Sequence, residues 1–148
     1  MRDVILAAPP GPTPHRFRIR FQDADPAGIV FFARLFDFAH DGYVAFLDAH
    51  EVRMAQEIPR GAWIAPLSGA EARFLAPLRF GEDAMAEVVG KQIQGSRVRL
   101  FHRVHNPTSV SAVLRTDHVF VSPQSFDRVP LPKAVVTALS RLPDLDVG

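Results

Sequence analysis

The sequence contains no cysteine, which excludes disulfide bonds, thiolate metal sites and a cysteine nucleophile. The formal net charge of +1 gives no general attraction to nucleic acid, which would require a strongly basic face. No uninterrupted apolar run is long enough to cross a bilayer, and the first residues lack the basic-then-apolar pattern of a secretory signal. We therefore expect a cytoplasmic protein with neither a membrane nor a nucleic-acid partner.

The length and composition fit one soluble globular domain. The chain has 148 residues, of which 47% are hydrophobic and 22% are charged, and it shows no internal repeat. A chain of this size buries most of its apolar surface without covalent cross-links. Four prolines crowd residues 1–14, which we interpret as a loose, Pro-rich N-terminal lead-in. Residues 15–148 are therefore predicted to form a single domain.

The most informative segment is a short polar turn followed by an almost unbroken apolar stretch. Asp23 and Asp25 lie on the turn, and a helix apolar on nearly every side is predicted over residues 30–47. Such a helix is buried, and its N-terminal end offers unpaired backbone N–H groups and a partial positive charge. A carboxylate beside fixed N–H donors in an apolar setting indicates acyl-group chemistry. Taken locally, Asp-Pro-Ala-Gly is more simply an ordinary turn that starts a helix.

Alternating patterns predict that most of the remaining chain forms a sheet. Residues 16–22 alternate strictly, with Phe17, Ile19 and Phe21 on one side. Further strands are predicted over residues 67–75, 84–94, 97–104 and 111–121, with a hairpin turn at residues 94–96 and a closing helix over residues 133–141. One curved antiparallel sheet wrapped around the long helix is the simplest way to bury that helix, so we predict an α+β fold.

The order of these elements, together with three motifs, resembles the hotdog fold, and more closely its 4-hydroxybenzoyl-CoA thioesterase branch. Asp23-Ala-Asp-Pro-Ala-Gly-Ile-Val30 is similar to the active-site turn of that branch. Pro77-Leu-Arg-Phe-Gly-Glu-Asp83 resembles the element that opens the family's central hairpin, and Val129-Pro-Leu-Pro132 resembles its C-terminal end. The resemblance implies a hotdog domain in which one curved antiparallel sheet wraps around a long central helix.

Within this branch, the motifs resemble two groups of enzymes. The wording of the first motif favours thioesterases that act on 4-hydroxybenzoyl-CoA. Phe31-Phe-Ala33 and His40-Asp-Gly-Tyr43 instead resemble the Tyr-Phe-Ala and His-Glu-Ala-Tyr of 1,4-dihydroxy-2-naphthoyl-CoA thioesterases, with Phe31 in place of Tyr and Asp41 in place of Glu. Both groups act on aromatic acyl-CoA. The resemblance therefore implies hydrolysis of an aromatic acyl-CoA thioester to the free acid and CoA.

The same resemblance implies catalytic roles for three residues. Asp25 matches the family's catalytic carboxylate, acting either as a nucleophile that forms a mixed anhydride or as a general base that activates water. The alternative for Asp25 is a helix-capping residue. The backbone N–H of Phe32 is expected to meet the thioester carbonyl. His40 either contacts the substrate or assists the carboxylate, or it is a core histidine. Asp23 is expected to fix the turn through bonds to backbone N–H groups.

Three more residues near this turn are predicted to contact the substrate. Gly28 allows a close approach to the backbone, and Phe31 lies at the start of the helix. Tyr43 shares a helical face with His40, three residues before it. The side chains of Phe31 and Phe32 are themselves predicted to pack in the core.

Basic residues at the predicted hairpin are the candidates for CoA binding. Lys91, Arg97 and Arg99 flank residues 94–96, where basic residues of the family meet the phosphates of CoA. A solvated strand edge with alternating Arg explains them equally well. No His, Asp and Glu cluster has convincing metal spacing, so we predict neither a metal nor a cofactor.

A single sheet of this kind leaves an unpaired edge that a second subunit would cover. We therefore expect a homodimer or homotetramer with the active site at the subunit boundary. Two alternative functions remain open: a thioesterase for acyl-carrier-protein or fatty acyl-CoA thioesters, and a non-catalytic acyl-CoA-binding hotdog domain. Asp25 argues against the second alternative, because a binding protein gains little from a carboxylate near a negatively charged ligand.

Overall fold

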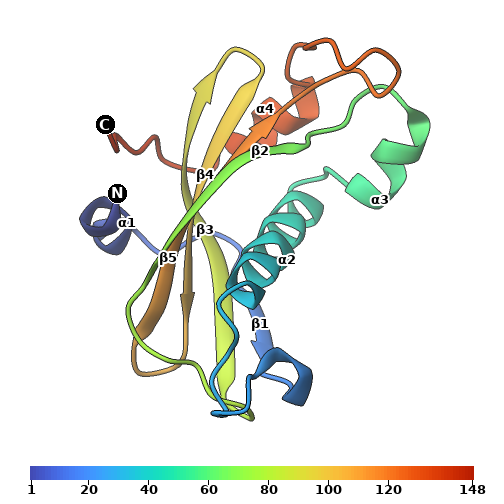
Figure 1. Ribbon diagram of the computed structural model, residues 1–148. Coiled ribbons are helices and arrows are strands. Elements are labelled where there is room, and N and C mark those ends of the chain that lie inside the picture. The colour runs from blue at the N-terminus through green and yellow to red at the C-terminus, as the bar shows by residue number, and fades with distance from the viewer.

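The molecule is built on one five-stranded antiparallel sheet. In the computed structural model, which describes residues 1–148, the strands lie in the order β1-β3-β4-β5-β2 (Figure 1). Gly95, at a φ of 60°, lies in the tight turn between β3 and β4. The predicted strands of the second half and their hairpin are confirmed. The strand bounds are His15–Arg18 for β1, Leu67–Phe74 for β2, Asp83–Gln94 for β3, Arg97–His105 for β4 and Val110–Val119 for β5.

The long helix α2, Arg34–Ala49, crosses one face of this sheet (Figure 1). Its buried residues recur every three or four positions, which is the pattern of a helix with one face toward a core. At Gly42 the helix lies so close to β3 that a Cβ atom would be 3.1 Å from the carbonyl oxygen of Ala86. The buried residues of α2 are Leu35, Phe38, Ala39, Gly42, Tyr43, Phe46 and Leu47.

Two parts of the helix prediction are wrong. The helix begins at Arg34 instead of residue 30, because the N–H of Val30 donates to the carbonyl oxygen of Leu78 at 2.8 Å and holds that residue in the preceding turn. The outer face of the helix is also polar, with Asp41 and Asp48 exposed. Within one chain the sheet therefore covers one side of the helix, not all of them.

The first strand is shorter than predicted. β1 ends at Arg18 and is followed by a 3-10 turn over Phe21–Asp23, which leaves the Phe21 side chain in solvent with 77% exposure. The turn forms because the Asp23 carboxylate accepts a hydrogen bond from the backbone N–H of Arg20 at 2.9 Å. Ile19 is buried, as predicted, but the alternation does not continue to Phe21.

The N-terminal residues cover the other face of the sheet, which we call the outer face. Arg2–Ala7 form helix α1, and its Ile5 is fully buried in a cluster with Phe101 and Val113. Leu145, near the C-terminus, packs against the same cluster. The prediction of a loose N-terminal lead-in is wrong, because α1 carries its own apolar anchor.

A buried ion pair holds this N-terminal segment in place. The Arg103 guanidinium donates to the carbonyl oxygens of Ala8 at 2.8 Å and Pro9 at 3.0 Å. It also lies 2.8 Å from Glu87, whose second carboxylate oxygen accepts the N–H of Gly11 at 2.9 Å. Arg103 thus satisfies carbonyl groups that the end of α1 leaves without intrahelical partners.

The remaining elements close one end of the core. Helix α3, Met54–Glu57, runs into a 3-10 turn over Ile58–Arg60, and the closing helix α4 spans Lys133–Leu139. Buried residues of α4 pack in one cluster with the C-terminal half of α2 and with Trp63. None of the helices combines the length and the apolar character needed to cross a bilayer.

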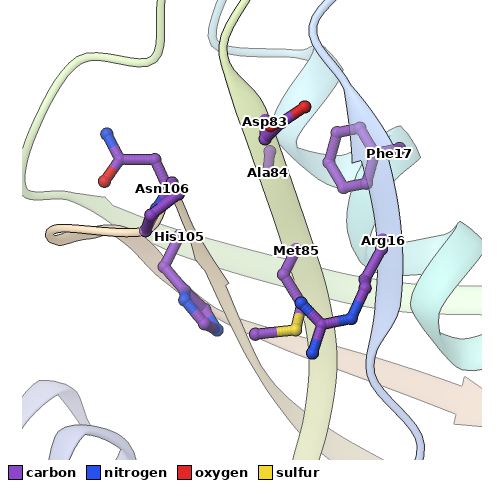
Figure 2. A pocket seen from close by; sticks show the side chains of 8 residues that line it. Arg16, Phe17, Asp83, Ala84, Met85, His105 and Asn106 are labelled. Atoms are coloured by element: carbon purple, nitrogen blue, oxygen red, sulfur yellow. The ribbon is translucent and has the colours of Figure 1, made fainter.

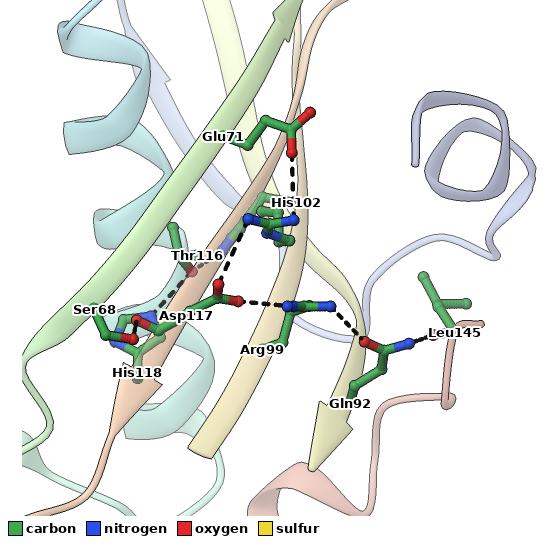
Figure 3. Close-up of polar contacts among 10 residues, drawn as sticks. Ser68, Glu71, Gln92, Arg99, His102, Thr116, Asp117, His118 and Leu145 are labelled. Carbon is green, nitrogen blue, oxygen red and sulfur yellow. Dashed lines mark hydrogen bonds and ion pairs between the residues drawn. The ribbon is translucent and has the colours of Figure 1, made fainter. Parts of the chain in front are cut away.

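Two histidines lie in the core between α2 and the sheet. Nε2 of His102 is 2.8 Å from Oγ1 of Thr116, and Nε2 of His118 is 3.0 Å from the same oxygen (Figure 3). Burial, reinforced by neighbouring histidines, lowers the pKa of His102 to about 3 and that of His118 to about 4. Both rings are therefore neutral in the folded protein at any pH near neutrality.

These lowered pKa values predict a loss of stability in weak acid. Between pH 6.5 and about 4 the unfolded chain binds protons that the buried rings exclude, so the free energy of unfolding falls by up to about 1.4 kcal/mol per pH unit for each histidine. Urea unfolding from pH 7 to 4.5 measures this slope. His118→Gln is expected to reduce the slope of the unfolding free energy against pH. His15→Gln, which changes a partly exposed histidine of β1, is expected to leave that slope unchanged. Equal slopes in the wild type and both variants would contradict the account.

Candidate active site

The Asp25 turn, residues 23–33, connects the 3-10 turn to α2. Oδ1 of Asp25 accepts the backbone N–H of Ala27 at 2.9 Å and that of Ile29 at 3.3 Å. The carbonyl oxygen of Asp25 accepts the N–H of Gly28, whose φ of 75° lies in the left-handed region that favours glycine. The carboxylate is thus held through one oxygen, while Oδ2 makes no hydrogen bond within the chain and the residue is exposed in the single chain.

Asp23 has a different environment from Asp25. It is 1% exposed, and the Arg20 guanidinium binds both of its oxygens at 2.9 and 3.1 Å. Burial alone would raise the pKa of Asp23, but hydrogen bonds from Arg20 and the charges of Arg20 and Arg34 outweigh burial and lower it. The bond from the Arg20 N–H to this carboxylate confirms that Asp23 fixes the turn.

The start of α2 presents free backbone donors next to this turn. The N–H of Phe31 donates to the carbonyl oxygen of Asp23 at 2.9 Å. The N–H groups of Phe32 and Ala33 make no hydrogen bond within the chain, and α2 begins one residue later at Arg34. Unpaired donors and the positive end of the helix dipole at this point favour an oxygen that carries negative charge.

Exposed aromatic side chains surround the Asp25 turn. Phe31 is 50% and Phe32 is 56% exposed, so their predicted packing in the core does not occur within one chain. The ring of Phe32 lies 6.2 Å from that of Phe74, and the ring of Phe21 lies 5.7 Å from that of Phe80. Exposed apolar side chains gathered around one site indicate a surface that another molecule covers.

An apolar cavity of about 290 Å³ opens beside this turn. It lies between the start of α2 and the segment that follows β2, and a single polar side chain, that of Ser111, is among those that line it. No motif in the sequence marks Ser111, because its position on this cavity arises from strand pairing between distant segments. The lining residues are Ile29, Val30, Phe32, Leu35, Phe74, Leu75, Ala76, Pro77, Leu78 and Ser111.

His40 and Tyr43 lie farther along α2. Six residues of helical rise, about 9 Å, separate His40 from Arg34 at the start of α2, so one chain does not bring His40 to the free donors that precede the helix. The ring of Tyr43 is 4.8 Å from that of His118, and the ring of His40 is 5.8 Å from it. Burial raises the pKa of the Tyr43 phenol, which is therefore neutral.

The basic residues of the hairpin do not join the Asp25 turn within one chain. Figure 1 shows the β3–β4 hairpin at the opposite end of the sheet from this turn. Lys91 is buried and pairs with Asp144 at 3.0 Å, and Arg99 pairs with Asp117 at 2.8 Å (Figure 3). Arg97 is partly exposed and has no carboxylate partner, so of the three it alone is available to a ligand.

A second cavity, of about 580 Å³, lies on the sheet between β1 and the paired ends of β3 and β4. Figure 2 shows Arg16, Met85 and His105 around it. None of the predicted site residues lines this cavity, and its one carboxylate, that of Asp83, accepts a hydrogen bond from Arg18 at 3.2 Å. The 290 Å³ cavity at the Asp25 turn is therefore the better candidate for an acyl group.

Comparison with known proteins agrees with the resemblance drawn from the motifs. The family model for the thioesterase-like superfamily matches residues 19–139. A 1,4-dihydroxy-2-naphthoyl-CoA hydrolase of Thermosynechococcus vestitus is 29% identical over 137 residues, covering 90% of this chain and 94% of the relative. Another from Synechococcus elongatus is 30% identical over 116 residues, covering 78% of this chain and 85% of the relative.

Solved structures resemble the fold closely. A 1,4-dihydroxy-2-naphthoyl-CoA thioesterase from Synechocystis superimposes with a TM-score of 0.81 at 23% identity, covering 86% of this chain and 95% of that one. A gentisyl-coenzyme A thioesterase gives a TM-score of 0.76 at 24% identity, covering 85% and 98%. These likenesses confirm the predicted hotdog fold, and the relatives confirm an enzyme that hydrolyses thioesters. The chain belongs to the thioesterase-like superfamily.

Proposed function

We propose that this enzyme hydrolyses an aromatic acyl-CoA thioester to the free acid and CoA. The observation that carries the proposal is the juxtaposition at the Asp25 turn. There, a carboxylate with one unpaired oxygen lies on the same turn as the free N–H groups of Phe32 and Ala33. Ile29, which donates its N–H to this carboxylate, lines an apolar cavity together with Phe32. The relatives named above act on 1,4-dihydroxy-2-naphthoyl-CoA, and we propose an acyl group of this type, with 4-hydroxybenzoyl as the alternative.

In the proposed reaction the thioester carbonyl oxygen accepts the N–H of Phe32 at the positive end of α2. One such donor contributes about 3 kcal/mol of transition-state stabilisation. Oδ2 of Asp25 either attacks the carbonyl carbon, so that the CoA thiolate leaves and a mixed anhydride forms that water then hydrolyses, or takes a proton from a water molecule that attacks the carbonyl carbon and displaces the thiolate. Gly28 supports either route, because its left-handed conformation closes the turn that positions the carboxylate.

The proposed assembly is a homodimer joined at β2, or a homotetramer of such dimers. β2 is an edge strand with one neighbour, β5, and its backbone groups on the other side are unpaired. Phe74 on β2 and Phe32 on the Asp25 turn form part of one exposed aromatic surface. Pairing of two β2 strands would cover this surface and place the site at the subunit boundary.

Such a dimer also suggests where CoA phosphates would bind. A two-fold axis perpendicular to the sheet exchanges its two ends, so the hairpin of one subunit would lie at the same end as the Asp25 turn of the other. Arg97 is then the proposed phosphate contact, because Lys91 and Arg99 are held in ion pairs within their own chain. His40 is proposed to contact the acyl group from α2 across the same boundary, with the ring of Tyr43, which is 5% exposed, packed 6.5 Å from the His40 ring.

Asp25→Asn tests the proposed carboxylate. The amide oxygen still accepts the N–H of Ala27, so the turn is expected to persist, while kcat falls roughly 100-fold or more because the carboxylate is lost. Release of CoA thiol measures the rate, and circular dichroism checks the fold. Asp41→Asn, an exposed position on α2, serves as the matched control. Equal rates for wild type and Asp25→Asn would contradict the assignment.

The acyl preference is tested with a panel of thioesters. We expect kcat/KM for benzoyl-CoA, 4-hydroxybenzoyl-CoA and 1,4-dihydroxy-2-naphthoyl-CoA to exceed that for palmitoyl-CoA by about tenfold or more, because the cavity is short and apolar. Faster release from an acyl-carrier-protein thioester would favour the carrier-protein alternative. Tight CoA binding without any hydrolysis would favour a non-catalytic binding domain.

The dimer is tested by charging its proposed interface. Phe74→Glu is expected to convert a dimer into a monomer, because it places an unpaired carboxylate in a surface that pairing would bury. Light scattering after size-exclusion chromatography gives the mass. Ile58→Glu introduces the same charge at a 40% exposed side chain outside the sheet and is expected to leave the dimer intact. A monomeric wild-type protein would contradict the proposed assembly.

A further inference from the structure

We infer that Ser111 determines acyl specificity by hydrogen bonding to a ring hydroxyl of the aromatic acyl group. The inference rests on the proposed function and narrows its substrate class to hydroxylated aromatic thioesters. It depends on the cavity beside the Asp25 turn and on one buried hydroxyl that the folded chain leaves without a partner.

Ser111 is an exception among the serines of this protein. It is 1% exposed, and its Oγ is buried without a hydrogen-bond partner. Every other serine makes at least one hydrogen bond through its hydroxyl oxygen. A buried hydroxyl without a partner costs free energy, and native proteins rarely keep one unless something else satisfies it. Substrate is the candidate partner, because Ser111 lines a cavity beside the proposed site.

The backbone around Ser111 fixes its place in the cavity wall. Its carbonyl oxygen accepts the N–H of Leu75 at 2.8 Å and that of Ala76 at 3.2 Å, which ties β5 to the segment after β2. The strand register also shifts at this point, between the pairs of residues 104 with 112 and 105 with 110. Ser111 is thus placed by main-chain bonds, and its hydroxyl is free to rotate toward a ligand.

The same cavity reaches the residues of the proposed chemistry. Ile29 lines it and donates its N–H to the Asp25 carboxylate, and Phe32 lines it and carries a free backbone N–H. A thioester whose carbonyl oxygen meets Phe32 would therefore extend its acyl group between the start of α2 and β5. Ser111 offers the only side-chain hydrogen-bonding group among the lining residues.

The chemistry of this wall selects a neutral hydroxyl. A phenolic O–H can donate to Oγ of Ser111, or its oxygen can accept from the serine O–H. No charged side chain lines the cavity, so a carboxylate substituent on the aromatic ring would be buried without a counter-ion. The acyl groups in the names of the relatives, dihydroxynaphthoyl and gentisyl, both carry ring hydroxyls. A site that bonds a substrate hydroxyl discriminates against the analogue that lacks it.

The test compares Ser111→Ala with wild type on benzoyl-CoA and on 2-, 3- and 4-hydroxybenzoyl-CoA. We expect kcat/KM for the preferred hydroxylated isomer to fall about tenfold, while kcat/KM for benzoyl-CoA stays within about twofold. Ser140→Ala, the same change at the exposed end of α4, is the matched control and should leave all four values unchanged. The Tm of unliganded Ser111→Ala should equal or exceed that of wild type, because an unpaired buried hydroxyl has been removed.

Each other outcome has a definite meaning. An equal loss on benzoyl-CoA and the hydroxylated esters, no loss on either, or a marked fall in Tm would overturn the role of Ser111 while leaving the proposed hydrolysis intact. Failure of the wild-type enzyme to hydrolyse any of the four thioesters would overturn the proposed function and this inference with it.

Discussion

The geometry of the candidate site depends on the buried carboxylate of Asp23. The carboxylate accepts hydrogen bonds from the backbone N–H and the guanidinium of Arg20, which ends β1 and forms the 3-10 turn. The main-chain carbonyl oxygen of Asp23 accepts the N–H of Phe31. That last bond leaves Phe32 and Ala33 as the residues with free N–H groups before α2. Two aspartates two residues apart thus have different roles. Asp23 is ionised and paired with Arg20, which shapes the turn, and Asp25 is held through a single oxygen with its second oxygen free.

Much of the fold follows from local patterns. Alternation predicted the strand over residues 97–104, and the glycine turn at residue 95 predicted the hairpin that joins it to the strand before it. The Asp25 turn was likewise marked by a contiguous motif. The start of α2 was missed because apolar residues near residue 30 are equally suited to a turn that packs on Leu78. The end of β1 was missed because an ion pair between Arg20 and Asp23, which are three residues apart, interrupts the alternation.

Other features depend on contacts between distant parts of the chain, which no local pattern reports. Helix α1 is stable because Arg103 binds the carbonyl oxygen of Ala8 and Glu87 binds the N–H of Gly11, 95 and 76 residues away in the sequence. Lys91 reads as a surface cation in the sequence, yet the C-terminal segment buries it against Asp144. Ser111 reaches the cavity only because β5 pairs with β2.

The two faces of the sheet also differ. The chain's own termini pack on the outer face, while on the other face α2 and the exposed aromatic surface leave the proposed site open to a second subunit.

The central claim is that a thioester carbonyl lies between the Asp25 carboxylate and the N–H of Phe32. A crystal structure of the enzyme with an aromatic acyl-CoA analogue, in which a methylene group replaces the thioester sulfur, tests it most directly. The account predicts the carbonyl oxygen about 2.7–3.1 Å from the Phe32 nitrogen, with an Asp25 oxygen either about 3–3.5 Å from the carbonyl carbon or hydrogen bonded to a water molecule beside that carbon. A carbonyl bound elsewhere, with Asp25 facing solvent in the assembled oligomer, would contradict it.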